Sequence, residues 1–161
     1  MRRLFAPALL MLSLAACGSG DEPADAPATP TPVALSAEQK TALMAALPAP
    51  YDAGDLENGA RAFARCRSCH TITPNGPNMT GPNLYGVFAR QAGTHVKYNY
   101  SPALKAAGFA WDAERLDHWL QNPRTFLPGN KMTFPGLPDA TDRRDVIAFL
   151  KVETGYAPAA Q

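Results

Sequence analysis

The feature that most limits how this chain can fold is a group of two cysteines and a histidine, C-R-S-C-H at residues 66–70. The pattern C-x-x-C-H is the signature of covalent haem attachment. Thiols three residues apart on one helical turn can reach the two vinyl groups of one porphyrin. The histidine that follows then lies under the iron, where it supplies the proximal nitrogen. The motif therefore predicts a fold that is completed by a large apolar group.

Three other uses of the cysteine pair compete with haem attachment. A zinc site needs four ligands, usually including a second pair, and only His95 and His118 remain, unpaired in the sequence. A thioredoxin-like redox pair needs a preceding strand and a βαβ pattern, which the sequence lacks. A disulfide within C-x-x-C would close a strained, short loop. Export of the protein would favour haem attachment over these three uses of the cysteines, because haem is attached outside the bacterial cytoplasm.

The first 17 residues predict such export. Two arginines precede an apolar stretch, residues 4–16, that is too short to span a membrane. The stretch ends in L-A-A-C, which resembles a bacterial lipoprotein signal and implies cleavage before Cys17 and acylation of that cysteine. An ordinary signal peptide cleaved nearby is the alternative, although Leu14 fits its small-residue pattern poorly. Both interpretations place the mature chain outside the cytoplasm.

Composition divides the rest of the chain. Residues 18–35 are rich in proline and alanine and predict a semi-extended tether; a spacer trimmed from the mature protein is the alternative. Residues 36–53 predict a short helix, with a capping box of Ser36 and Gln39, followed by a linker. We expect this helix to pack against the main domain. Residues 54–156 predict that domain, and residues 157–161 form a tail.

The domain is expected to be all-α, because its helix signals are good and its strand signals poor. Its four expected helices begin near Asp55, at Ser101, at Asp112 and at Thr141 or Asp142, and the last three end at Gly108, at Asn122-Pro123 and at Gly155. Loops are expected over residues 71–93 and 123–139. About 100 residues arranged in this way make a thin core, which a bound group would complete.

A sixth iron ligand has four candidates in the domain. Met132 lies in a stretch of turn formers, residues 128–134, where core packing does not explain a methionine. Met79 follows His70 closely and should stay on the proximal side. His118 is expected at the surface of its helix, and His95 is most simply a loop residue. The residues therefore favour Met132.

Four ordered motifs resemble class I cytochrome c over residues 54–156. They are C-R-S-C-H at 66–70, G-P-N-L-Y-G at 81–86, P-G-N-K-M at 128–132 and R-D-V-I-A-F-L-K at 144–151. The resemblance implies a single-haem class I fold, with short helices and long loops wrapped around one covalent haem c and its iron. The tether resembles that of membrane-attached bacterial members.

The resemblance also implies how the haem is held. Cys66 and Cys69 would form the thioethers, and His70 and Met132 would ligate the iron. The carbonyl of Pro82 would accept a hydrogen bond from the other ring nitrogen of His70, which fixes the tautomer.

Three further residues match family positions that hydrogen-bond the haem propionates: Arg90, Tyr100 and Trp111. Buried propionates need such donors. The alternatives are a surface arginine and two ordinary core aromatics. Three other positions around the expected distal ligand depart from the family pattern. Trp119 stands for a usual tyrosine, Leu104 for a frequent asparagine and Asn130 for a frequent threonine.

These features predict an electron-transfer protein and not an enzyme, because both axial positions of the iron would be filled. The whole chain has 15 basic and 14 acidic residues, which excludes binding to nucleic acid driven by phosphate neutralisation. From residue 54 onward, 12 basic and 9 acidic residues leave a net charge of +3.

The expected partners are a membrane electron donor and acceptor, a cytochrome bc-type complex and a terminal oxidase or similar, of a respiratory or photosynthetic chain. We expect a monomer on the periplasmic side of the cell envelope, anchored by lipid. A fixed haem subunit of a larger oxidoreductase and a ligand-binding or peroxidatic haem protein are the alternatives.

Overall fold

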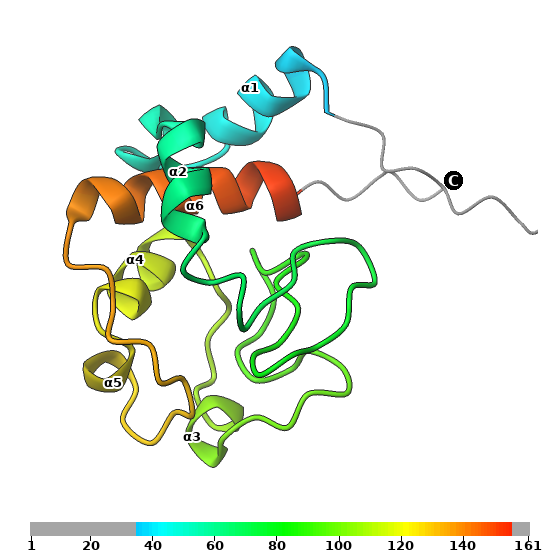
Figure 1. The fold of residues 1–161 in the computed structure, drawn as a ribbon, viewed down its shortest axis with the longest axis vertical. Coiled ribbons are helices and arrows are strands. Elements are labelled where there is room, and N and C mark those ends of the chain that lie inside the picture. Colours follow the sequence, from blue (N-terminus) through cyan, green and yellow to red (C-terminus); the bar gives the residue numbers. More distant parts are fainter. Residues whose placement is uncertain (1–34, 156–161) are drawn as a thin grey trace, which may run out of the picture. The chain divides into compact units, whose positions relative to one another are not determined.

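The computed structural model describes residues 35–155, which form a helical domain without a β-strand in that range. Its elements are α1 (Ala37–Ala45), the 3-10 helix η1 (Tyr51–Ala53), α2 (Leu56–Phe63), α3 (Pro102–Lys105), α4 (Ala113–Gln121), α5 (Pro123–Phe126) and α6 (Ala140–Thr154) (Figure 1). One isolated antiparallel bridge joins Gln91 and Ala110. The predicted all-α fold is confirmed. The expected signal with Cys17, the tether up to residue 34 and residues 156–161 lie outside the described residues.

Side-chain caps start the helices where the sequence predicts them. Ser36 and Gln39 form the capping box of α1. The carboxylate of Asp55 accepts the backbone N–H groups at the start of α2. Ser101 and Asp112 cap α3 and α4 in the same way. Each cap satisfies amide groups that have no partner within the helix.

The start of α6 differs from the prediction of Thr141 or Asp142. Asp139 is the N-cap, because its Oδ1 accepts from the backbone N–H of Thr141 at 2.7 Å and of Asp142 at 3.2 Å. Several residues in this stretch can cap a helix, and Asp139 is the first of them. Gly155 is the C-cap, as expected.

Two further boundaries differ. The helix that begins after Ser101 ends at Lys105, before the predicted stop at Gly108. The N–H of Ala106 makes the last four-residue bond, to Pro102, and that of Ala107 bonds to Leu104, only three residues back. Part of the segment predicted as a loop forms α5, where the Asn122 side chain accepts from the N–H of Thr125. The residues that end α4 therefore start another turn of helix, and the domain has five helices from α2 to α6.

Helices α2 and α6 cross closely (Figure 1). A Cβ at Gly59 would lie 2.2 Å from the backbone oxygen of Asp145 and 2.7 Å from the Cβ of Phe149. The rings of Phe63 and Phe149 then pack 5.5 Å apart. Only glycine permits this approach, as expected for these two helices.

The N-terminal helix packs on α6, as expected. Leu47 and Tyr51, which follow α1, are both buried in the main core. Next to them the chain passes so close to α6 that a Cβ at Gly54 would lie 2.5 Å from the Cβ of Ala148. No helix between residues 35 and 155 is both long and apolar enough to cross a membrane.

Candidate haem site

A cavity of about 410 Å³ opens between the helices and the long loops. Its walls include apolar side chains of α2, α4 and α6, such as Phe63, Leu116 and Leu150. All eight site residues predicted from the sequence line it: Cys66, Cys69, His70, Pro82, Arg90, Tyr100, Trp111 and Met132. The fold therefore gathers residues from positions 66 to 132 of the chain around one hollow.

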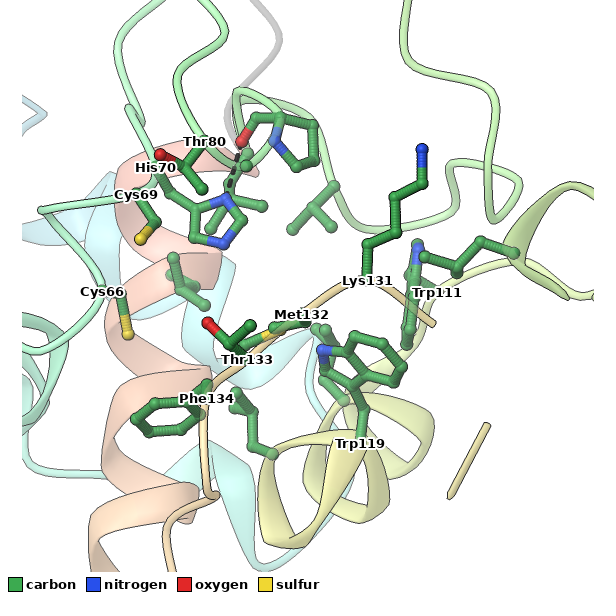
Figure 2. Close-up of a pocket in the computed structure, with 18 of the residues that line it drawn as sticks. Cys66, Cys69, His70, Thr80, Trp111, Trp119, Lys131, Met132, Thr133 and Phe134 are labelled. Carbon is green, nitrogen blue, oxygen red and sulfur yellow. Dashed lines mark hydrogen bonds between the residues drawn. The ribbon is translucent and has the colours of Figure 1, made fainter. Parts of the chain in front are cut away.

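The C-x-x-C-H motif forms a tight turn directly after α2. The N–H of Cys66 donates to Phe63 at 2.8 Å, and those of Cys69 and His70 donate to Cys66 at 3.0 and 2.9 Å. These bonds bring both thiols and the imidazole to one side of the cavity (Figure 2). No disulfide joins the two cysteines, and burial raises the pKa of the Cys66 thiol, where it carries no covalent link, to about 11. The disulfide alternative is therefore not adopted.

The imidazole of His70 is held from behind by residues 81 and 82. Its Nδ1 lies 2.7 Å from the carbonyl oxygen of Pro82. Because a carbonyl only accepts, Nδ1 donates the hydrogen, and Nε2 keeps its lone pair. Burial lowers the pKa of His70 despite the opposing effect of the Pro82 carbonyl. The ring is thus poised as a neutral metal ligand.

Met132 lies across the cavity from His70 (Figure 2). It comes from the loop between α5 and α6, and Asn130 shapes that loop. The Oδ1 of Asn130 accepts from the N–H of Met132 at 2.8 Å, while its Nδ2 donates to the carbonyls of Pro123 and Leu127, both at 2.8 Å. Asn130, which stands where the family frequently has threonine, therefore makes three hydrogen bonds that hold the Met132 loop.

The other three candidates for the sixth ligand, all within the described range, do not line the cavity. Met79 is 45% exposed. His118 is exposed on α4. The ring of His95 bonds to Arg90 from outside the cavity. Of the four candidates, Met132 alone has the position that the prediction requires.

The three predicted propionate-binding residues form one wall of the cavity. Tyr100 and Trp111 are buried. Arg90 is half-buried and donates to the carbonyls of Tyr85 and Asn83, both at 3.1 Å. Burial lowers the pKa of Arg90 and raises that of Tyr100. Arg90 is thus half-buried in the cavity wall, while Tyr100 and Trp111 also belong to the hydrophobic core.

Sequence reasoning missed Tyr98. It lines the cavity, its hydroxyl donates to the carbonyl of Thr80 at 2.6 Å, and its ring lies 4.7 Å from that of Tyr100. Two aromatic residues at alternate positions share one face of an extended chain, and this spacing is the signal that would have found it. The departures Leu104 and Trp119 also line the cavity, and Trp119 packs on Trp111 with ring centroids 5.4 Å apart.

The donor set fits an iron porphyrin better than a bare metal ion. Between residues 35 and 155, no three His, Cys, Asp or Glu side chains gather as a metal site. Two thiols, an imidazole and a thioether instead surround an apolar hollow, and a histidine–methionine pair is a recurrent set of axial haem ligands. A side chain at residue 81 would intrude on His70, so the wall behind the ring is also shaped for it.

Comparison with known proteins decides the family. Residues 56–152 match the cytochrome c family model. The chain belongs to the cytochrome c family. It is 40% identical over 105 residues to a cytochrome c of Kluyveromyces lactis, covering 65% of this chain and 96% of the relative. It is 42% identical over 105 residues to cytochrome c2 of Rhodomicrobium vannielii, covering 65% and 84%.

A solved structure agrees. Cytochrome cH from Methylobacterium extorquens superposes with a TM-score of 0.56 and 43% identity, covering 61% of this chain and 98% of the other. The predicted class I fold is thus confirmed. As a member of the cytochrome c family, the protein binds one covalently attached haem c with its iron, as expected.

Proposed function

We propose that this cytochrome c is a carrier of single electrons, with His70 and Met132 as the axial ligands. The observation that supports this most is the position of these two side chains on opposite sides of one cavity (Figure 2). With both in place, no axial position is left for substrate, peroxide or oxygen. The bound haem supplies a one-electron iron couple, and a thioether ligand raises its potential relative to two histidines.

The surrounding residues hold the group and set its environment. Cys66 and Cys69 provide the two thioether links. Arg90, Tyr100 and Trp111 lie in one wall, where they can donate to buried propionates. Holding the haem in a largely apolar cavity suits outer-sphere transfer, because few groups then reorganise when the iron changes charge.

We also propose that the protein works while anchored to a membrane on the periplasmic side. The L-A-A-C sequence before the tether supports acylation at Cys17. The 18 tether residues would extend to roughly 55 Å in polyproline form. Tethering keeps a carrier at high effective concentration near its partners. Those partners would be a cytochrome bc-type donor and a terminal oxidase or similar acceptor, met by the positively charged domain as a monomer.

A visible spectrum of the purified full-length protein tests the ligation. We expect the weak thioether–iron band in the ferric state and no binding of carbon monoxide by the ferrous state at neutral pH. Binding of carbon monoxide would instead support a ligand-binding or peroxidatic haem protein. Stable co-purification with an oxidoreductase would support a fixed subunit.

Cell fractionation tests the anchor. The native protein should sediment with membranes, and replacing residues 1–17 by an ordinary cleavable signal should release it into the soluble periplasmic fraction with an unchanged spectrum. The release should slow respiration where partner encounter is limiting. Native protein that is already soluble would overturn the anchored mechanism while leaving the ligation proposal intact.

A further inference from the structure

His95 contacts two residues of the cavity wall from outside the cavity. Its ring Nδ1 lies 3.0 Å from Nη1 of Arg90. A guanidinium has donors only, so Nδ1 must accept and carries no hydrogen in this arrangement. The backbone N–H of His95 also donates a hydrogen bond to the hydroxyl oxygen of Tyr100. One loop residue therefore holds both Arg90 and Tyr100, although it does not itself line the cavity.

The ring is the one acceptor of Arg90 that titrates near neutral pH. The other two recorded acceptors are the backbone carbonyls of Tyr85 and Asn83, which do not change with pH. Protonation at Nδ1 would turn that atom into a donor. The bond from Arg90 would then be lost, and two cations would face each other.

Within residues 35–155, the side chains around His95 include no carboxylate. The groups near it are the guanidinium of Arg90, the ammonium of Lys97 in the same loop and the phenols of Tyr85 and Tyr100. No ion pair of the described residues joins His95 to a carboxylate. Burial, together with the charge of Arg90, lowers the pKa of His95 below its usual value of about 6.5. The neutral ring is thus the form in which the Arg90 bond exists.

We propose that His95 is a positioning residue for Arg90 and that its protonation couples the charge at the haem site to pH. The proposal rests on the proposed role of Arg90 beside the propionates. A proton on His95 adds positive charge near the iron and frees Arg90 to bond elsewhere in the cavity. Positive charge favours the ferrous state over the ferric state. The reduction potential should therefore be higher with His95 protonated and fall as the pH rises through its pKa.

The first test measures the reduction potential of the full-length holoprotein between about pH 5 and 8, the range in which histidines titrate. In His95→Asn the Asn Oδ1 can still accept from Arg90 but does not titrate, so the pH dependence should disappear. His118→Asn, which removes the exposed histidine of α4, should leave the pH dependence of the reduction potential unchanged. A flat profile in the parent protein, or a slope that survives His95→Asn or vanishes in His118→Asn, would overturn the proposal.

The second test follows the His95 ring by NMR in both oxidation states. If the proton and the electron are coupled, the proton dissociation constant should be about two- to tenfold larger in the ferric protein, the size expected from one unit charge acting through partly solvated protein. Equal constants in the two states would overturn the coupling. Absence of the thioether–iron band in the parent protein would contradict ligation by Met132. It would leave the His95 proposal intact, because the titration of His95 can still be measured.

Discussion

His70 and Pro82 are joined by a hydrogen bond of 2.7 Å between the ring Nδ1 and the backbone carbonyl oxygen, across twelve positions of the chain. Gly81 lies against the same ring, where a Cβ would come within 2.2 Å of Cε1 and 2.6 Å of Nδ1. The orientation of the candidate iron ligand therefore depends on a backbone segment that has no side chain at residue 81.

Gly81→Ala should displace the His70 ring. The added methyl group overlaps the imidazole, and overpacking of this kind costs about 1–3 kcal/mol of folding free energy. We expect less haem-loaded protein and a lower free energy of unfolding, measured by denaturant titration with the visible spectrum. Thr80→Ala is the matched control, because the bond from Tyr98 goes to the Thr80 backbone. If Gly81→Ala matched this control, the steric argument would be wrong.

Met132→Ala should open one axial position of the iron. Its loop positions the thioether opposite His70, and loss of a soft ligand lowers the reduction potential. The ferrous variant should bind carbon monoxide, and redox titration should give a lower potential than for the parent. Met79→Ala, at an exposed methionine outside the cavity, should change neither property. A Met132→Ala variant that stays closed to carbon monoxide would point to another sixth ligand.

Asp145 should contribute to acid stability. It is buried where α6 meets α2 and accepts from Arg144, from the backbone N–H of Asp55 and from Asn58. Burial alone would raise the pKa of Asp145, but these bonds together lower it below its usual value. A carboxyl with a lowered folded-state pKa stabilises fully above its unfolded pKa of about 3.9, and that stability is lost as the pH falls through the folded-state pKa.

Asp145→Asn should therefore lower the free energy of unfolding at pH 7 by about 1–3 kcal/mol, because buried donors lose a charged acceptor. The difference from the parent should shrink below about pH 4, where the carboxyl becomes neutral first in the unfolded chain and then, below its lowered pKa, in the folded one. Denaturant unfolding at several pH values measures this. Glu153→Gln, at an exposed carboxylate of the same helix, should follow the parent at every pH. A difference independent of pH would contradict the assignment.

Tyr51→Phe should weaken the attachment of the N-terminal segment. The buried Tyr51 hydroxyl bonds to Asp117, which also pairs with Arg143, and Arg143 donates to the carbonyls of Leu137 and Pro138. Loss of the hydroxyl should cost about 0.5–1.5 kcal/mol in the free energy of unfolding. A double-mutant cycle with Asp117→Asn should show coupling between the two sites. Additive effects would mean that the bond contributes nothing.

Tyr51 should also make the free energy of unfolding depend on pH in the alkaline range. Burial and the charge of Asp117 raise the pKa of Tyr51 to about 12, whereas an unfolded tyrosine titrates near pH 10. The contribution to stability is full below the unfolded value and is lost as the pH rises through the folded one. Between these values the parent should lose stability relative to Tyr51→Phe, which stability curves above about pH 10 would measure.

Local signals could be read from the sequence because they act within a few residues. Asp55, Ser101 and Asp112 cap their own helices through bonds to amides two or three positions ahead. Where several capping residues followed one another, local chemistry could not rank them, and α6 began at Asp139 instead of Thr141 or Asp142.

In the candidate haem site, too, some residues were predicted from the sequence and others were not. The C-x-x-C-H motif, the ordered family motifs and three further matching positions predicted eight site residues, all of which line the cavity. The sequence did not indicate that Asn130 would hold the Met132 loop, that Tyr98 would line the cavity or that His95 would accept from Arg90. Which side chains meet here depends on the paths of the loops after folding, and only the alternation of Tyr98 with Tyr100 was a local signal for one of them.

The helical class, most helix starts and the donor set for a covalent haem can be read from the sequence, because caps, turn formers and ligand spacing act over short stretches of chain. Which side chains meet is visible only in the folded domain. It brings Gly59 against Asp145, His70 opposite Met132 and Tyr51 to Asp117. The physical reason is that such contacts join residues more than fifty positions apart, and their geometry exists only once close packing has fixed the helices and loops together.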